Sequence, residues 1–221
     1  MHSPQTHQIP GKSLRNLLVR LKKEEINALP LARWEGPIHI VSNQTQLQAA
    51  VKTLRTTNLL GFDTETRPTF RKGQSYPPAL LQLADGQSVF LFKLYQLGIP
   101  KALTDILSNQ QTIKVGVAVG FDTVQLQQIH PFLPQGFIDL ADISRHLGMQ
   151  HHGLRGLAAV TLGIRISKSV RTTNWAAPDL SAKQIRYAAT DAWISRAVYS
   201  RLMEIHHGDI ADDTPPFSHD S

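Results

Sequence analysis

Three short apolar segments in the first half of the chain constrain its fold most. They are residues 59–64, 79–83 and 88–92, each of which has the length of a β-strand. The last two are joined through Asp85-Gly86, a dipeptide typical of a tight β-hairpin. Further along, helical patterns surround a Val-rich segment at 113–119 that is typical of a buried strand. Antiparallel strands followed by alternating helices and strand predict an α/β fold, with one mixed β-sheet flanked by helices in a single domain.

The chain is predicted to consist of an arm, a main domain and a tail. Residues 1–35 would form a basic N-terminal arm with a short helix after Ser13, and its basic side chains either grip phosphates or form a solvated helix face. Residues 36–205 would form the main domain. The periodicity predicts a first strand at 38–41 and helices at 45–56, 99–108, 121–129, 140–147, 154–162 and 180–205. Residues 206–221 are acidic and have the composition of a disordered tail.

The charge of the chain indicates the kind of partner that it binds. Lys and Arg number 23 against 17 acidic residues, and the five acids after Arg201 leave residues 1–201 with a net charge of +11. A body this basic favours a polyanionic partner, with a merely soluble surface as the alternative. The chain contains no cysteine, which excludes disulfides, thiol catalysis and cysteine-based metal sites. It also lacks an apolar run that could span a bilayer and a signal-peptide pattern, so we expect a cytoplasmic protein with no membrane partner.

The strand at 59–64 ends in a pair of carboxylates. In Phe62-Asp63-Thr64-Glu65 the two acidic side chains are two residues apart, so they point to the same face of the strand. Two carboxylates so close repel each other unless a cation lies between them. Ligand sets made of oxygen atoms alone select hard ions such as Mg²⁺ or Mn²⁺. The pair therefore predicts a divalent-metal site, and a solvated pair in a loop is the alternative.

Two further acidic positions have the context of a functional site. Asp122 follows the Val-rich strand at the start of a helix, where a carboxylate that favours the helix dipole is the alternative explanation. On the last helix, Tyr187 and Asp191 are four residues apart and share one face with apolar residues. An aspartate on an apolar stripe is costly unless it is paired or binds a metal, which favours a functional role for Asp191. In contrast, His151-His152 has no ligand partner at metal spacing and is interpreted as part of a surface turn.

Taken together, these residues resemble the three motifs of the DEDD superfamily of 3′→5′ exonucleases. The motifs are Phe62-Asp63-Thr64-Glu65, Val115-Gly116 with Phe121-Asp122, and Tyr187 with Asp191. The tyrosine is typical of the DEDDy branch, and residues 168–175 and 180–192 are most similar to the Werner-syndrome-type exonuclease domain and more distantly similar to ribonuclease D. The resemblance implies a ribonuclease H-like fold, and residues 36–205 would be the 3′→5′ exonuclease domain.

The resemblance also implies a role for each motif residue. The protein would hydrolyse phosphodiester bonds from the 3′ end of a nucleic acid and release nucleoside monophosphates, with two divalent metal ions, Mg²⁺ or Mn²⁺, as cofactors. Asp63 would bridge both ions, and Asp122 would support the second. Glu65 and Asp191 would complete the site of the first ion. Tyr187 would orient the attacking water through its hydroxyl group.

The predicted nucleic-acid contacts lie beside the first and third motifs. They are Arg67, Arg71, Lys72, Lys168, Arg171, Asn174 and Trp175. The polar ones would contact phosphates, with a solvated surface as the alternative. Trp175 would stack on a terminal base, with packing in the core as the alternative. DNA is favoured over RNA as the substrate, and the alternatives are ribonuclease D-like processing of RNA 3′ ends or a relative that binds nucleic acid without catalysis.

Overall fold

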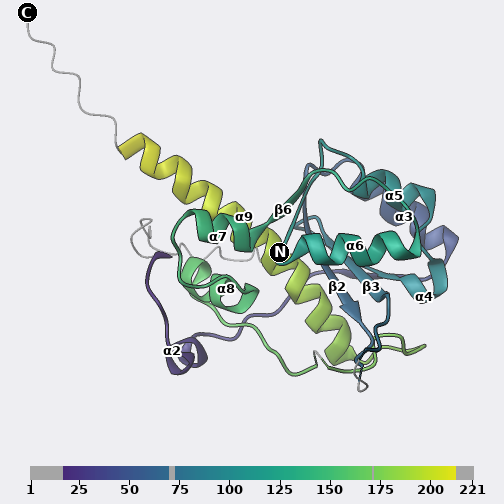
Figure 1. Cartoon of the computed structure of the whole chain (residues 1–221), viewed down its shortest axis with the longest axis horizontal. Coiled ribbons are helices and arrows are strands. Elements are labelled where there is room, and N and C mark those ends of the chain that lie inside the picture. The colour runs from purple at the N-terminus through teal and green to yellow at the C-terminus, as the bar shows by residue number, and fades with distance from the viewer. Residues whose placement is uncertain (1–16, 70–72, 171, 213–221) are drawn as a thin grey trace, which may run out of the picture.

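The computed structural model describes residues 17–69, 73–170 and 172–212 and shows one six-stranded β-sheet flanked by helices (Figure 1). The strands are β1 (Ile38–Val41), β2 (Leu59–Thr66), β3 (Pro78–Ala84), β4 (Val89–Lys93), β5 (Ile113–Gly116) and β6 (Phe137–Asp139), in the spatial order β1-β4-β3-β2-β5-β6. As predicted, β2, β3 and β4 are antiparallel neighbours. In contrast, β1 is parallel to β4, β5 is parallel to β2, and β6 is parallel to β5. The predicted mixed α/β sheet is confirmed, and β2 lies inside it.

The helices agree with the predicted pattern except at three places. They are α2 (Lys23–Ala28), α3 (Gln44–Leu54), α4 (Leu94–Leu97), α5 (Lys101–Leu107), α6 (Val119–Ile129), α7 (Leu140–His146), α8 (Leu154–Leu162) and α9 (Ala182–Asp212). The short helices α2 and α4 were not predicted, and the predicted helix after Ser13 lies almost entirely outside the described residues. No helix in the described ranges is both long and apolar enough to cross a membrane.

The predicted boundaries were wrong at the ends of β5 and α9. β5 ends at Gly116, three residues earlier than predicted, because Ala118 turns the chain with a left-handed φ of 61° and Val119 already begins α6. α9 continues to Asp212, so the predicted disordered tail from residue 206 begins as helix. An existing helix is extended at the gain of one hydrogen bond per residue, and polar composition alone does not end it. The rest of the predicted tail lies outside the described residues.

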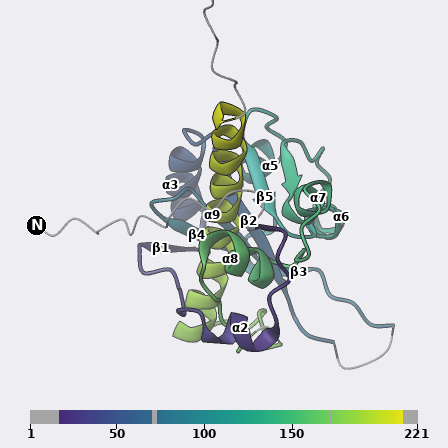
Figure 2. The same cartoon turned by 90° about the vertical axis from the view of Figure 1, so that its left-hand side faces the viewer.

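The two faces of the sheet pack against different helices. On one face, Phe62, Leu83 and Phe92 join the core formed with α3, α5 and α6. On the other face, strand residues such as Leu80 and Leu91 pack with small residues of α9, namely Ala188, Ala189 and Ala192. Alanine side chains allow α9, the long helix that ends in yellow in Figures 1 and 2, to lie close to the strands. This second face carries the two acidic side chains of the first motif, Asp63 and Glu65.

The described part of the predicted arm packs along the main domain, and we call residues 17–35 the N-terminal strap. At its start, Leu17 is fully buried in a cluster formed mainly by α7, α8 and α9. In its middle, the backbone N–H of Arg165 donates to the carbonyl of Pro30 at 2.9 Å. At its end, the backbone N–H of Trp34 donates to the Thr190 hydroxyl on α9 at 3.0 Å. The strap therefore connects the region around α8 to α9.

Candidate active site

The site begins at a close contact between β2 and α9. A Cβ atom on Gly61 would lie 1.9 Å from the backbone oxygen of Ala192, so only glycine allows the helix to approach the strand this closely. Two residues further along β2 is Asp63, and the residue before Ala192 is Asp191. The contact therefore brings the first and third motifs side by side.

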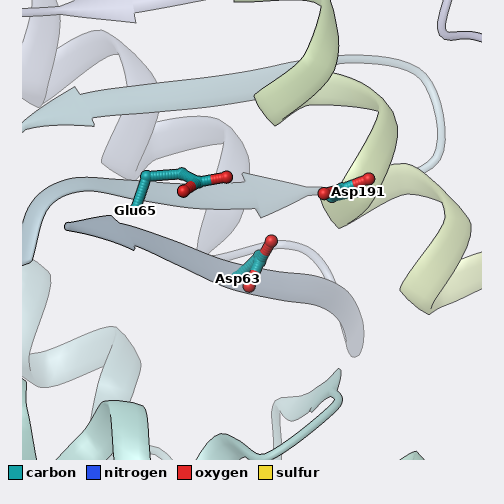
Figure 3. Close-up of side chains that lie close together, drawn as sticks. All are labelled: Asp63, Glu65 and Asp191. Atoms are coloured by element: carbon teal, nitrogen blue, oxygen red, sulfur yellow. The ribbon is translucent and has the colours of Figure 1, made fainter. Parts of the chain in front are cut away.

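Three carboxylates meet at this place (Figure 3). Asp63, Glu65 and Asp191 each offer one oxygen atom, and these atoms all lie within 4.8 Å of one another. Glu65 and Asp191 are buried, with 8% and 7% of their surface exposed, and Asp63 is half-buried. Figure 3 shows two of the side chains on β2 and the third on α9, gathered around one space. The structure thus brings together three of the four acids that the resemblance implied as metal ligands.

Burial and mutual repulsion oppose the ionisation of these carboxyls. Burial, followed by the charges of Asp191 and Glu65, raises the pKa of Asp63 well above its ordinary value. Burial also raises the pKa of Asp191 to about 7, although a hydrogen bond from Tyr187 acts in the opposite direction. The Oδ1 atom of Asp191 is buried and has no hydrogen-bond partner among the described residues. A divalent cation would neutralise the repulsion and coordinate the unpartnered oxygen, so these residues fit a hard metal ion.

Asp122 lies beside this cluster. It belongs to the first turn of α6, and its Oδ1 accepts a 2.8 Å hydrogen bond from the hydroxyl of Thr64. Burial raises the pKa of Asp122 to about 6 despite this hydrogen bond. Its charge also contributes to the raised pKa of Asp63. The second motif is therefore close enough to Asp63 to interact electrostatically, but it is not one of the three carboxylates that converge. Sequence reasoning did not identify Thr64 as its partner.

Tyr187 lies one helical turn before Asp191 and interacts with its carboxylate. Burial and the negative charges of Asp191 and Glu65 raise the pKa of Tyr187, so its hydroxyl keeps its proton at neutral pH. The tyrosine ring packs against Trp175, with the ring centroids 6.0 Å apart. The hydroxyl group is therefore a neutral group, held on a packed ring, that can donate or accept a hydrogen bond.

A cleft of about 1260 Å³ opens over these residues. Asp63, Glu65, Tyr187 and Asp191 lie among the residues that line it. Basic residues of other segments line it as well: Arg20, Lys22 and Lys23 of the strap, Arg155 of α8, and Lys168. The cleft thus combines clustered acids with a basic wall. Sequence reasoning missed Arg155, because nothing in its local sequence distinguishes it from the other arginines of the chain.

The strap is held at the cleft by a histidine. The Nε2 atom of His151 accepts a 3.0 Å hydrogen bond from the backbone N–H of Leu21. Burial and the charge of Arg20 lower the pKa of His151, which favours the neutral ring that this hydrogen bond requires. His151 also lines the cleft. The histidine pair interpreted as a surface turn therefore contains a residue that fastens the strap.

The structure distributes the predicted nucleic-acid contacts unevenly. Lys168 is exposed and lines the cleft. Arg67 is exposed, and its guanidinium carbon lies 4.8 Å from the centroid of the Tyr76 ring, outside the lining of the cleft. Asn174 is exposed, and its side-chain oxygen accepts a 3.1 Å hydrogen bond from the Ala176 N–H within a turn. The remaining basic candidates, Arg71, Lys72 and Arg171, lie outside the described residues.

The stacking role predicted for Trp175 was wrong for this structure. Its surface is 1% exposed, and the ring belongs to the apolar layer between α9 and the sheet. A ring so enclosed offers no face to a base. The alternative of core packing holds, because the small alanines of α9 leave space that a large side chain fills. Trp175 instead supports the ring of Tyr187.

Comparison with known proteins agrees with this arrangement. Residues 38–206 match the profile of the 3′-5′ exonuclease family. The bifunctional 3′-5′ exonuclease/ATP-dependent helicase WRN of Mus musculus is 28% identical over 167 residues, which are 73% of this chain and 12% of that protein. Exonuclease 3′-5′ domain-containing protein 2 of Drosophila melanogaster is 34% identical over 196 residues, which are 86% of this chain and 31% of that protein.

A solved structure shares the fold. Ribonuclease D of Escherichia coli matches with a TM-score of 0.67 at 26% identity, over 76% of this chain and 45% of that one. This chain spans less than half the length of each of these three proteins. The profile match, however, extends over most of the chain and contains all three motifs. Because the matched region carries both the predicted acids and the sheet that positions them, the chain belongs to the 3′-5′ exonuclease family.

Proposed function

We propose that this protein removes nucleotides from the 3′ end of a nucleic acid by metal-dependent hydrolysis, and that residues 36–205 together with the strap carry this activity. The observation that supports it most is the convergence of Asp63, Glu65 and Asp191 within 4.8 Å at a cleft with a basic wall. When bound at these carboxylates, two divalent ions would supply an activated water, stabilise the charge at phosphorus and assist the leaving 3′-oxygen.

The protein's own residues would divide the work of binding these ions. Asp63, Glu65 and Asp191 would hold one ion, because their oxygens are the only converging set of three acidic ligands among the described residues. Asp122 would support the second ion together with Asp63, whose ionisation it already influences. The oxygen-only donor set supports a hard divalent cation, and we propose Mg²⁺ or Mn²⁺.

Tyr187 would position the attacking water. Its raised pKa means that the hydroxyl is protonated at neutral pH, so it cannot act as the base that removes a proton from water. A protonated hydroxyl can accept a hydrogen bond from water at Oη while it donates to a carboxylate or a phosphate oxygen. We therefore assign Tyr187 to orientation of the nucleophile, which can be tested apart from metal binding.

The basic wall would bind phosphates that precede the scissile one. Arg20, Lys22 and Lys168 are exposed, and they line the same cleft as the carboxylates. Cations placed along a strand contribute affinity without reading the bases, so the substrate class is a nucleic acid of any sequence. The Werner-type motifs favour DNA, whereas the similarity to ribonuclease D, described as an exoribonuclease involved in structured RNA processing, favours RNA as the second candidate.

A degradation assay tests this function. Matched DNA and RNA strands, labelled at either end and either single-stranded or with a recessed 3′ end, are incubated with Mg²⁺, Mn²⁺ or EDTA. We expect a 3′ label to be released at once as a mononucleotide, a 5′ label to give a ladder, and EDTA to abolish both. Binding of the strands without any metal-dependent cleavage would instead support the alternative of a non-catalytic nucleic-acid-binding protein.

A further inference from the structure

Gln82 is a buried polar residue that the fold does not explain. It lies in the middle of β3 and is 0% exposed. Neither Oε1 nor Nε2 of its amide has a hydrogen-bond partner among the described residues. An unpartnered buried amide destabilises a protein, and an apolar side chain of similar size would fill the same space without that cost. A reason other than packing is therefore needed for glutamine at this position.

The sheet places Gln82 next to the carboxylate cluster. In the antiparallel pairing of β2 with β3, Gln82 is directly opposite Asp63. Residues opposite each other in such a pair point to the same face, with Cβ atoms about 4.5–5.5 Å apart, which is within reach of a glutamine side chain. On the other side, Gln82 is opposite Leu91 of β4, which belongs to the apolar layer beneath α9. The neighbouring strand that offers a polar side chain in register is thus β2, through Asp63.

The second unpartnered group of this region belongs to the same cluster. The Oδ1 atom of Asp191 is buried without a hydrogen-bond partner in the described part of the chain, and a ligand oxygen of Asp191 lies within 4.8 Å of one of Asp63. A neutral amide can orient a carboxylate by donating to it, and it adds no charge that would repel a cation. Lysine or arginine would cancel the negative charge that attracts the ion.

We propose that Gln82 is a positioning residue: its amide, which has no partner among the described residues and lies in register with Asp63, would donate an N–H to the Asp63 carboxylate when that carboxylate holds a metal ion, and would thereby orient the Asp63–Asp191 pair. This inference rests on the proposed metal-dependent function of the same site. Groups that orient metal ligands act on metal affinity even though they do not touch the ion. The residue is thus expected to cost stability and to serve the site, and these two effects can be separated experimentally.

Two substitutions of opposite character test the proposal. Gln82→Met keeps the length and bulk of the side chain but removes the amide, whereas Gln82→Asn keeps the amide on a chain one carbon shorter. Leu83→Met is the matched control, because Leu83 is the next residue of β3, is 0% exposed and packs on the opposite face of the sheet. For each variant, Mn²⁺ affinity is measured by calorimetry without nucleic acid, and Tm is measured in EDTA.

The proposal expects the two measurements to rank the variants differently. Gln82→Met should bind Mn²⁺ about 10–100-fold more weakly, with a Tm in EDTA equal to or above that of the unmodified protein. Gln82→Asn should lose less affinity but have the lower Tm, because the shorter side chain leaves a cavity. Leu83→Met should bind Mn²⁺ as the unmodified protein does.

The outcomes distinguish this proposal from the proposed function. If Gln82→Met binds Mn²⁺ normally, or if the affinities follow the order of the Tm values, Gln82 is a packing residue and the inference is overturned. If the unmodified protein binds Mn²⁺ but degrades no strand, the proposed exonuclease function fails while the role of Gln82 in metal binding is still decided by its variants. If the unmodified protein binds no Mn²⁺, both proposals fail.

Discussion

At the scale of one residue, Asp191 shows that a side chain of the candidate site can lower the stability of the folded protein. Its carboxyl is buried on a face of α9 that carries apolar residues, and its Oδ1 has no partner among the described residues. The cost of this arrangement appears as a pKa raised to about 7. Burial of a carboxyl without a full set of partners stabilises nothing, so its presence is best explained by a ligand that the folded protein binds.

Replacing either aspartate of the converging cluster should separate stability from activity. We expect Asp63→Asn and Asp191→Asn to be folded and to lose at least about 10²-fold in turnover, because an amide holds a divalent ion poorly. In EDTA, the Tm should be unchanged or raised, since the substitution removes repulsion between buried carboxylates. Thermal melting and strand degradation on the same preparations check this. Turnover close to that of the unmodified protein would contradict the metal assignment.

Tyr187→Phe tests the proposed orientation of water. We expect turnover to fall on the order of 10²-fold, because one positioned hydrogen bond is removed. Affinity for Mn²⁺ and for the nucleic acid should change little, and the Tm should hardly move, because the ring and its contact with Trp175 remain. Kinetic, binding and melting measurements on this single variant are sufficient. Full turnover with a lowered Tm would instead assign the tyrosine to the core.

At the scale of elements, the contact between β2 and α9 holds the motifs together. The contact depends on Gly61, where a Cβ would overlap with the backbone of Ala192. A backbone atom cannot rotate away as a side chain can, so any larger residue must push α9 from the strand. Asp191 would move with the helix, away from Asp63 and Glu65.

Gly61→Ala should therefore damage both the fold and the site. We expect a loss of about 2 kcal/mol or more in the free energy of unfolding, as is common for overpacking in a core, and a weaker affinity for Mn²⁺. Gly120→Ala in α6 is the matched control, because a Cβ there meets nothing within 4 Å, and alanine is the better helix former. Urea unfolding of both variants measures and compares their free energies of unfolding. Equal stability of the two would show that the close approach of α9 to β2 is not required.

The N-terminal strap is a second element whose effect can be isolated. Two test variants are the double substitution Arg20→Ala with Lys22→Ala and the single substitution Lys168→Ala. We expect both to bind nucleic-acid strands of any sequence more weakly and with a flatter dependence of affinity on salt concentration. Each phosphate that is no longer neutralised lowers the slope of log affinity against log salt concentration by roughly one. Turnover at saturating substrate should change little. Lys52→Ala on α3 is the control, because Lys52 is exposed and does not line the cleft. If the salt dependence of binding is unchanged in both test variants, these residues belong to a solvated surface and do not contact phosphates.

At the scale of the whole molecule, protons and metal ions should compete for the site. The folded-state pKa values of Asp191 and Asp122, about 7 and about 6, lie above the ordinary value of 3.8. Between pH 3.8 and about 7, the metal-free folded protein therefore binds more protons than the unfolded chain. The stability that these protonated carboxyls contribute is present at low pH and is lost as the pH rises through about 7. Metal binding requires the ionised carboxylates and has the opposite pH dependence.

We expect the stabilisation of the folded protein by Mn²⁺ to increase with pH. The rise in Tm that Mn²⁺ produces should be small near pH 5.5 and several-fold larger near pH 8. The difference in Tm between the unmodified protein and Asp191→Asn, both in EDTA, should shift in favour of the variant as the pH rises. Melting curves at both pH values with and without Mn²⁺ measure this. A Mn²⁺-induced rise in Tm that is larger near pH 5.5 than near pH 8 would contradict the raised pKa values of these carboxyls.

Features that depend on short spacings could be predicted from the amino-acid sequence. The residues of β1 and α8 were predicted with their observed bounds, and the Asp85-Gly86 hairpin joins β3 to β4. The common face of Asp63 and Glu65 follows from a period of two, which is a property of any strand. β6 was missed, because three residues are too few to show a period.

Which of these local features meet in space depended on the tertiary structure. The approach of Asp191 to Glu65 depends on the packing of α9 over Gly61, a contact between segments more than a hundred residues apart in the chain. Trp175 has the same local sequence whether it faces a base or the core, and the space beneath the alanines of α9 places it in the core. The basic wall likewise combines residues of the strap with Arg155 of α8 and Lys168, and the hydrogen bond of His151 that fastens the strap is encoded by no local spacing. Side-chain periodicity acts along one element, whereas a site is formed where several elements exclude water together, and that depends on the packing of the whole chain.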